Sequence, residues 1–93
     1  MVVGILQLEV FFPYSHSLKD KRRVLHGFKD RIRSRYNAAL AEIDFQDKWQ
    51  RALIGIVTLN SQASVVEGLL NKILSDAANL EEAEIVAHDI RYL

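Results

Sequence analysis

The sequence contains no cysteine, and this absence excludes several kinds of site. Without thiols the chain has no disulfide bond, no thiolate ligand for zinc and no cysteine nucleophile. Nothing in the composition indicates an oxidising compartment, so we expect a cytoplasmic protein. The three histidines are far apart and fit no metal-ligand spacing, so we expect neither a metal site nor a cofactor.

Long uninterrupted apolar runs are missing as well. The most apolar stretch, residues 1–12, contains Gln7 and Glu9 and falls short of the roughly 18 apolar residues of a membrane-spanning helix. The same stretch lacks the basic leader and the small-residue cleavage site of a signal peptide. We therefore expect a strand here and no contact with a membrane.

The 93 residues are 49% apolar, which suffices for the core of one domain, residues 1–93, but not of two. Ser17 is a good helix N-cap, and Asp20 three residues later resembles a capping box. Apolar spacing and turn residues predict the remaining elements. The predicted order is strand 2–12, helix 17–36, strand 38–46, strand 51–59, helix 61–78 and strand 83–92.

The two middle strands should form a hairpin. Alternation in residues 38–46 predicts that Ile43 lies on the buried face of its strand, while Glu42 and Asp44 face outward. Residues 51–59 are almost wholly apolar, as in a central strand. The order β-α-β-β-α-β is typical of an α+β ferredoxin-like sandwich, a four-stranded antiparallel sheet with both helices on one face.

The other face of this sheet has no helix to cover it. Because the first and third strands are apolar on both sides, we expect a homodimer through the open face or an edge strand. The polar residues Gln7, Glu9, Glu42 and Asp44 should make the open face acidic. For Glu42 and Asp44, solvation or pairing between subunits is a better explanation than a catalytic carboxylate pair. That face also lacks the aromatic pattern of an RNA recognition motif, so any nucleic acid should meet the helix side.

The first helix holds eight of the twelve basic residues of a chain whose net charge is zero, and only Asp20 and Asp30 oppose them. Helical spacing separates its residues into stripes. The stripe predicted to face the sheet contains Leu18, Leu25, Phe28, Ile32 and Tyr36. A second stripe beside it contains Arg22, His26, Lys29 and Arg33.

Two interpretations of these charges stay open. Long basic side chains often form a solvated helix face. Against this, Lys19, Lys21, Arg22 and Arg23 lie in the first turns, where cations oppose the helix dipole and free backbone amides favour an anion. The helical wheel turns Lys21 towards the apolar stripe, so it either contacts a ligand or pairs with a carboxylate of a neighbouring loop.

Lys48, Trp49 and Arg51 place an indole between two cations at the predicted hairpin. Such a combination can stack on bases or bind phosphate. The alternative is that Trp49 covers the end of the core or forms a subunit contact.

Several segments resemble the YlxP-like family of bacterial proteins, domain of unknown function 503. They are His16-Ser17-Leu18-Lys19-Asp20-Lys21-Arg22, Glu42, Gln46-Asp47-Lys48-Trp49-Gln50-Arg51 and Gly55-Ile56, and the resemblance covers essentially the full chain. It implies a ferredoxin-like fold and brings no catalytic residues. Genes of this family often lie beside those for transcription termination, translation initiation and ribosome maturation factors, which implies a connection to RNA or the ribosome.

Our hypothesis from the sequence is a small non-enzymatic protein that binds RNA or the ribosome through phosphate contacts of the first helix. The alternatives are a module that docks an acidic protein, and an enzyme acting on a phosphorylated small molecule. Acylphosphatases share this topology, but residues 13–16 lack their glycine-rich turn and its arginine. The candidate binding residues are Lys19, Lys21, Arg22, Arg23, His26, Lys29, Arg33, Lys48, Trp49 and Arg51.

Overall fold

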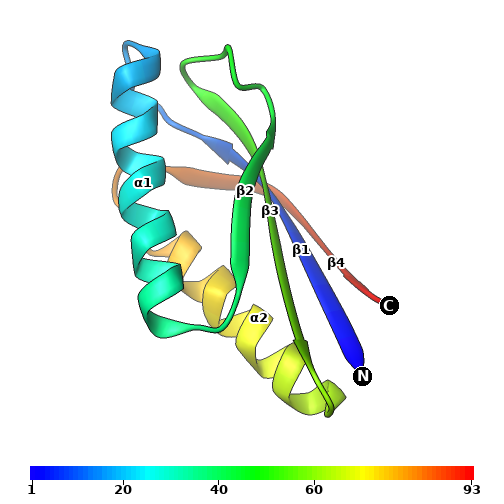
Figure 1. Cartoon of the computed structure of the whole chain (residues 1–93). Helices are drawn as coiled ribbons and strands as arrows, with labels where there is room; N and C mark the ends of the chain where they lie inside the picture. Colours follow the sequence, from blue (N-terminus) through cyan, green and yellow to red (C-terminus); the bar gives the residue numbers. More distant parts are fainter.

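Four strands and two helices follow one another in the order β-α-β-β-α-β (Figure 1). The computed structural model describes residues 1–93. The elements are β1 (Val2–Phe11), α1 (Leu18–Arg35), β2 (Ala39–Asp44), β3 (Arg51–Asn60), α2 (Ala63–Ala78) and β4 (Glu84–Tyr92). The predicted ferredoxin-like α+β fold is confirmed, and the bounds of its elements differ from the predicted ones by only one or two residues.

The sheet is antiparallel throughout, with strand order β2-β3-β1-β4. The two long apolar strands β1 and β3 lie in its centre, while β2 and β4 are its edges. The chain ends lie side by side (Figure 1), because Val3 and Leu93 exchange backbone hydrogen bonds of 3.1 and 2.8 Å.

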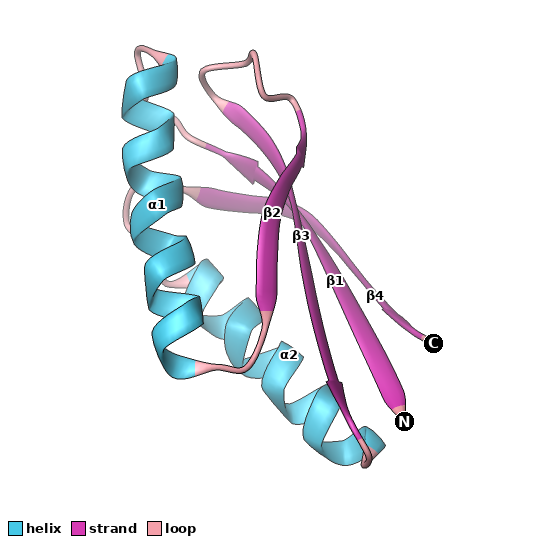
Figure 2. Ribbon diagram, viewed as in Figure 1, coloured by secondary structure: helices cyan, strands magenta, loops and turns pink.

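Both helices cover the same face of the sheet (Figure 2). Alternate residues of β1, including Leu6 and Leu8, are buried against them, whereas Gln7 between them is exposed on the open face. From α1 the core receives Phe28 and Ile32, as the apolar stripe predicted. The α2 helix contributes Val66, Leu70, Ile73 and Ala77. Neither helix is long and apolar enough to cross a membrane.

The predicted alternation of β2 is reversed. Leu40 is buried, so Glu42 two residues later also points to the helix side. Ile43 lies instead on the open face, where it is 52% exposed and packs over Gly55. A β-bulge between Glu42 and Asp44 then turns Asp44 to the open side.

The prediction that Glu42 belongs to an acidic open face is therefore wrong. From the sequence, Glu42 was placed on the solvent side of β2, because burying an unpaired carboxylate is unfavourable. Here a cation from α1 compensates Glu42 on the helix side. On the open face, Glu9 is paired with Arg51 at 2.6 Å, so the face is less acidic than the sequence indicated.

Candidate functional site

The start of α1 is fixed by its own side chains. The backbone N–H of Asp20 donates to Oγ of Ser17 at 3.1 Å, which confirms the predicted N-cap. The carboxylate of Asp20 accepts a hydrogen bond from the backbone N–H of His16 at 3.0 Å. This arrangement already places a negative charge at the helix N-terminus, where it interacts favourably with the helix dipole. The cations further along α1 are thus better candidates for binding an anion than the N-terminal amides.

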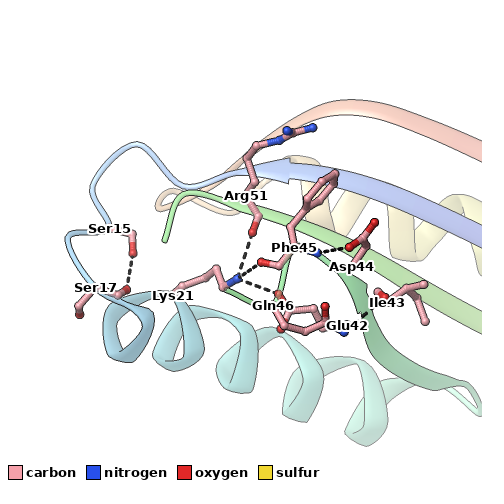
Figure 3. A network of polar contacts seen from close by, with 9 residues as sticks. All are labelled: Ser15, Ser17, Lys21, Glu42, Ile43, Asp44, Phe45, Gln46 and Arg51. Carbon is pink, nitrogen blue, oxygen red and sulfur yellow. Dashed lines mark hydrogen bonds and ion pairs between the residues drawn. The ribbon is translucent and has the colours of Figure 1, made fainter. Parts of the chain in front are cut away.

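Lys21 is completely buried, with 0% of the residue exposed. Its Nζ donates to Oε2 of Glu42 at 2.8 Å, to the carbonyl oxygen of Phe45 at 2.9 Å and to that of Arg51 at 3.1 Å (Figure 3). An ammonium group has three N–H donors, and all three have acceptors within the chain. The buried ammonium has no free donor for an anionic ligand, and the alternative that Lys21 pairs with a carboxylate is confirmed.

The loop between β2 and β3, residues 45–50, is tied to the loop that precedes α1. Nε2 of Gln50 donates to the carbonyl oxygens of Pro13 at 3.3 Å and Ser15 at 3.2 Å. The backbone N–H of Phe12 donates to the carbonyl oxygen of Gln50 at 2.9 Å. Together with the hydrogen bond from Lys21 to the carbonyl oxygen of Arg51, these contacts hold residues 16–22 and 46–51, two of the segments that carry the family resemblance, next to each other.

Arg51 is engaged rather than free. Its guanidinium is paired with Glu9 and lies 4.0 Å from the centre of the Phe45 ring, a cation–π contact. The side chain is half exposed and can still contact a ligand, but Glu9 neutralises its charge. We conclude that Arg51 contributes more to the shape of this corner than to its positive potential.

The predicted second stripe of α1 stands beside the edge strand β2. Arg22, His26 and Lys29 line a groove of about 230 Å³ whose other walls come from Leu25, Leu40, Ala41, Glu42 and Ile54. Arg33 continues the stripe one helical turn further. None of the four side chains forms an ion pair within the chain, and Glu42 is already bonded to Lys21.

Two other cations of α1, Arg23 and Arg35, behave differently. Arg23 pairs with Glu82 at 2.8 Å, and Arg35 lies 3.5 Å from Asp76. The hydrogen bond and charge of Glu82 raise the pKa of Arg23 above its usual value. Pairing therefore removes Arg23 from the free cations, although the sequence placed it in the binding set. Lys19 is exposed and has no ion-pair partner, so it stays in that set.

Trp49 is 56% exposed at the end of the β2–β3 hairpin. This exposure is contrary to the alternative that the indole covers the end of the core. Trp49 lines a hollow of about 450 Å³ together with Phe11, Lys48 and Arg51. Three of the predicted site residues are thus brought together here, at the end of the molecule where α1 begins (Figure 1).

Two features of this corner were missed by sequence reasoning. Phe45 has a positive φ of 64°, and Gln50 joins two loops through its side-chain amide. A left-handed conformation is usually signalled by Gly, Asn or Asp, so a phenylalanine gives no warning. Gln50 lies within residues 46–51, a segment that carries the family resemblance, and that position was the one available signal.

Comparisons with known proteins support the family resemblance over most of the chain. A family model described as "Protein of unknown function (DUF503)" matches residues 3–90. The "Uncharacterized protein YlxP" of Bacillus subtilis (strain 168) is 31% identical over 83 residues, which is 89% of this chain and 90% of that protein. Both matches extend over most of the chain, including α1 and the β2–β3 loop.

Proposed function

Since the chain belongs to the DUF503 family of proteins of unknown function, we propose its function from the site itself: a small non-enzymatic protein that binds RNA through phosphate contacts of α1. It acts in the cytoplasm, and ribosomal RNA is the candidate ligand. The observation that carries the proposal is the unpaired stripe of Arg22, His26, Lys29 and Arg33.

The absence of acidic partners along this stripe is significant because the chain has as many acidic residues as basic ones. Carboxylates pair with Arg23 and Arg35, whereas no side chain of the stripe forms an ion pair, and Glu42 in the wall of its groove is already bonded to Lys21. Unpaired cations that repel one another along one face raise the local positive potential and attract an anion. With a rise of 1.5 Å per residue, Arg22 and Arg33 are about 16 Å apart, which suits an extended polyanion better than a small phosphate compound.

Phosphate contacts position an RNA without reading its sequence. Binding should therefore weaken steeply with salt, with a logarithmic slope of about −0.7 per neutralised phosphate of a single strand. Fluorescence anisotropy of a labelled RNA, titrated with the protein at several salt concentrations, measures this slope. If no RNA binds at low salt, or if binding is indifferent to salt, the proposal fails.

A matched pair of variants separates the stripe from net charge. The test variant carries Arg22→Gln, Lys29→Gln and Arg33→Gln, and the control carries Arg23→Gln, Arg31→Gln and Arg35→Gln. Both lose three positive charges from α1, but the test variant alone empties the stripe. We expect at least a tenfold greater loss of affinity in the test variant. Equal losses would show that only overall charge matters.

An acidic protein is the second candidate ligand, because the groove beside the stripe is partly apolar, with Leu25, Leu40 and Ile54 in its walls. Pulldown with and without nuclease distinguishes the two ligands. An RNA-mediated partner is released by nuclease, whereas a directly bound protein stays on the column.

We also propose that the protein is a homodimer through the open face of the sheet. Ile43, Val57 and Leu59 are exposed there and form an apolar surface in the middle and at the far end of β3. Light scattering at micromolar concentration should return twice the monomer mass, and Leu59→Lys should return the monomer mass. Val65→Lys, at an exposed apolar position of α2, is the matched control and should leave the dimer intact.

A further inference from the structure

Trp49 is the only tryptophan of the chain, and it is exposed on a loop whose backbone is anchored. The loop that carries it is anchored on both sides of residue 49. The backbone N–H of Lys48 donates to the carbonyl oxygen of Phe45 at 2.9 Å, and the carbonyl oxygen of Gln50 accepts from Phe12 at 2.9 Å. The buried ammonium of Lys21 holds Phe45 from below (Figure 3). An indole on an anchored loop loses little conformational freedom when a ligand binds.

The hollow beside Trp49 is suited to a flat group without net charge. Asp47 and Lys48 both line it and carry one charge of each sign, while Arg51 is paired with Glu9. Its volume of about 450 Å³ lies within the range of small-ligand sites. Aromatic surface comes from Trp49 and Phe11, and polar groups surround it. This is a poor site for a phosphate but a good one for a ring that carries hydrogen-bonding groups.

The stripe of free cations begins at the same end of the molecule and runs away from it along α1. The α1 stripe begins at Arg22, next in sequence to Lys21, whose ammonium bonds to Phe45 and Arg51 at the two ends of the Trp49 loop. In Figure 1 the β2–β3 loop and the N-terminal turns of α1 lie at one end of the molecule. A ligand with charged and aromatic parts can therefore reach both surfaces.

We infer that the RNA bound by this protein is single-stranded, with one of its bases stacked on Trp49 and its phosphates on the α1 stripe. The inference rests on the proposed function and adds the class of RNA. A base in a duplex has its faces covered by its neighbours, whereas an unstacked base can lie on an aromatic side chain. Trp49 then acts as the stacking platform, and the stripe supplies the charge that a neutral hollow lacks.

The single tryptophan makes the test direct. Anisotropy of a labelled twelve-nucleotide RNA reports binding, and the intrinsic fluorescence of Trp49 in the same titration reports stacking. We expect the single strand to quench the indole emission in parallel with the anisotropy change. A duplex of the same sequence should bind more weakly or leave the emission unchanged.

Variants test the platform independently. Trp49→Ala should weaken single-strand binding by roughly tenfold or more, the effect of losing one stacked base, while Trp49→Phe should retain most of the affinity. Val65→Ala removes exposed apolar surface from α2 and is the control, with circular dichroism checking that each variant is folded.

The possible failures are distinguishable. If RNA binds through the stripe but the emission does not change and Trp49→Ala binds normally, the inference is overturned and the proposed function stands. If no RNA binds, both are overturned. If the emission shifts to the blue with rising protein concentration in the absence of RNA, a second copy of the chain covers Trp49, and the inference is overturned in favour of that contact.

Discussion

The carbonyl oxygen of Phe45 accepts a hydrogen bond from Nζ of Lys21 at 2.9 Å, and Phe45 has a left-handed backbone with φ of 64°. A non-glycine residue in this region is strained by about 1 kcal/mol. The charge-assisted hydrogen bond from Lys21 offsets this strain and fixes the direction of the β2–β3 loop. A residue of the basic helix thus determines the shape of the hairpin that presents Trp49.

Lys21→Met should strongly destabilise the protein. The substitution retains the apolar stem of the side chain but leaves Glu42 and two carbonyl groups without their donor. Removing one partner of a buried ion pair typically costs about 3–5 kcal/mol, and partial exposure of Glu42 favours the lower value. Urea denaturation measures the loss. Lys19→Met, on the exposed side of the same helix, is the control and should change stability by less than about 0.5 kcal/mol.

Adding Glu42→Leu to Lys21→Met should recover part of the lost stability, since the uncompensated carboxylate is then removed. A double variant as unstable as Lys21→Met would show that the two carbonyl groups, not the ion pair, account for the effect.

Glycine substitutions should have opposite signs in α1 and β1. A Cβ added at Gly27 meets no atom within 4 Å, so Gly27→Ala should stabilise the helix by about 0.5–1 kcal/mol. A Cβ added at Gly4 would overlap Val66 and lie 2.8 Å from Cδ1 of Leu70. Gly4→Ala should therefore destabilise the protein by about 1–3 kcal/mol. Thermal unfolding compares them, and a shift of the same sign in both would contradict the packing of α2 on β1.

The hydrogen bond between Tyr36 and Asp76 should make stability depend on pH above neutrality. The Tyr36 hydroxyl donates to Oδ2 of Asp76 at 2.8 Å, and this bond raises the pKa of Tyr36 in the folded state. The protonated phenol is thus favoured by folding, so its contribution is fully present below the unfolded pKa, near 10, and is lost as the pH rises through the higher folded value.

Tyr36→Phe should accordingly be less stable than the parent protein at pH 7, with a difference that shrinks as the pH rises above about 10. Urea denaturation across this range measures it. The exposed Tyr14 gives the control Tyr14→Phe, whose difference from the parent should be small at every pH. A Tyr36→Phe difference that is constant up to pH 11 would refute the assignment.

Two glutamines of the same loop should differ in how they hold Trp49. Gln50 bonds to the carbonyl oxygens of Pro13 and Ser15 across the corner, while Gln46 bonds only to Ile43 within its own hairpin. Gln50→Ala should therefore lower the fluorescence anisotropy of Trp49 by freeing the loop, and Gln46→Ala should not. Equal values in the two variants would mean that backbone bonds alone fix the loop.

The fold was predictable because each element carries its own local signal. Ser17 and Asp20 mark a helix start, and the apolar spacing of Phe28 and Ile32 gives the buried side of α1. The prediction was wrong in β2, where Glu42 faces the helices and Ile43 faces outward. Periodicity gives two possible phases for such a strand, and the choice depended on a cation 21 residues earlier in the chain.

The sequence by itself determined the order of the elements, the family, and the concentration of positive charge in one helix, since composition, spacing and capping are local properties. Only the tertiary structure decided which of those charges are free. Lys21 is buried and paired with Glu42. Arg23 and Arg35 also pair with carboxylates, whereas no side chain of the stripe from Arg22 to Arg33 forms an ion pair. The physical reason is that the availability of a charge depends on which distant groups the fold brings within a few ångströms of it, and no local pattern encodes that distance.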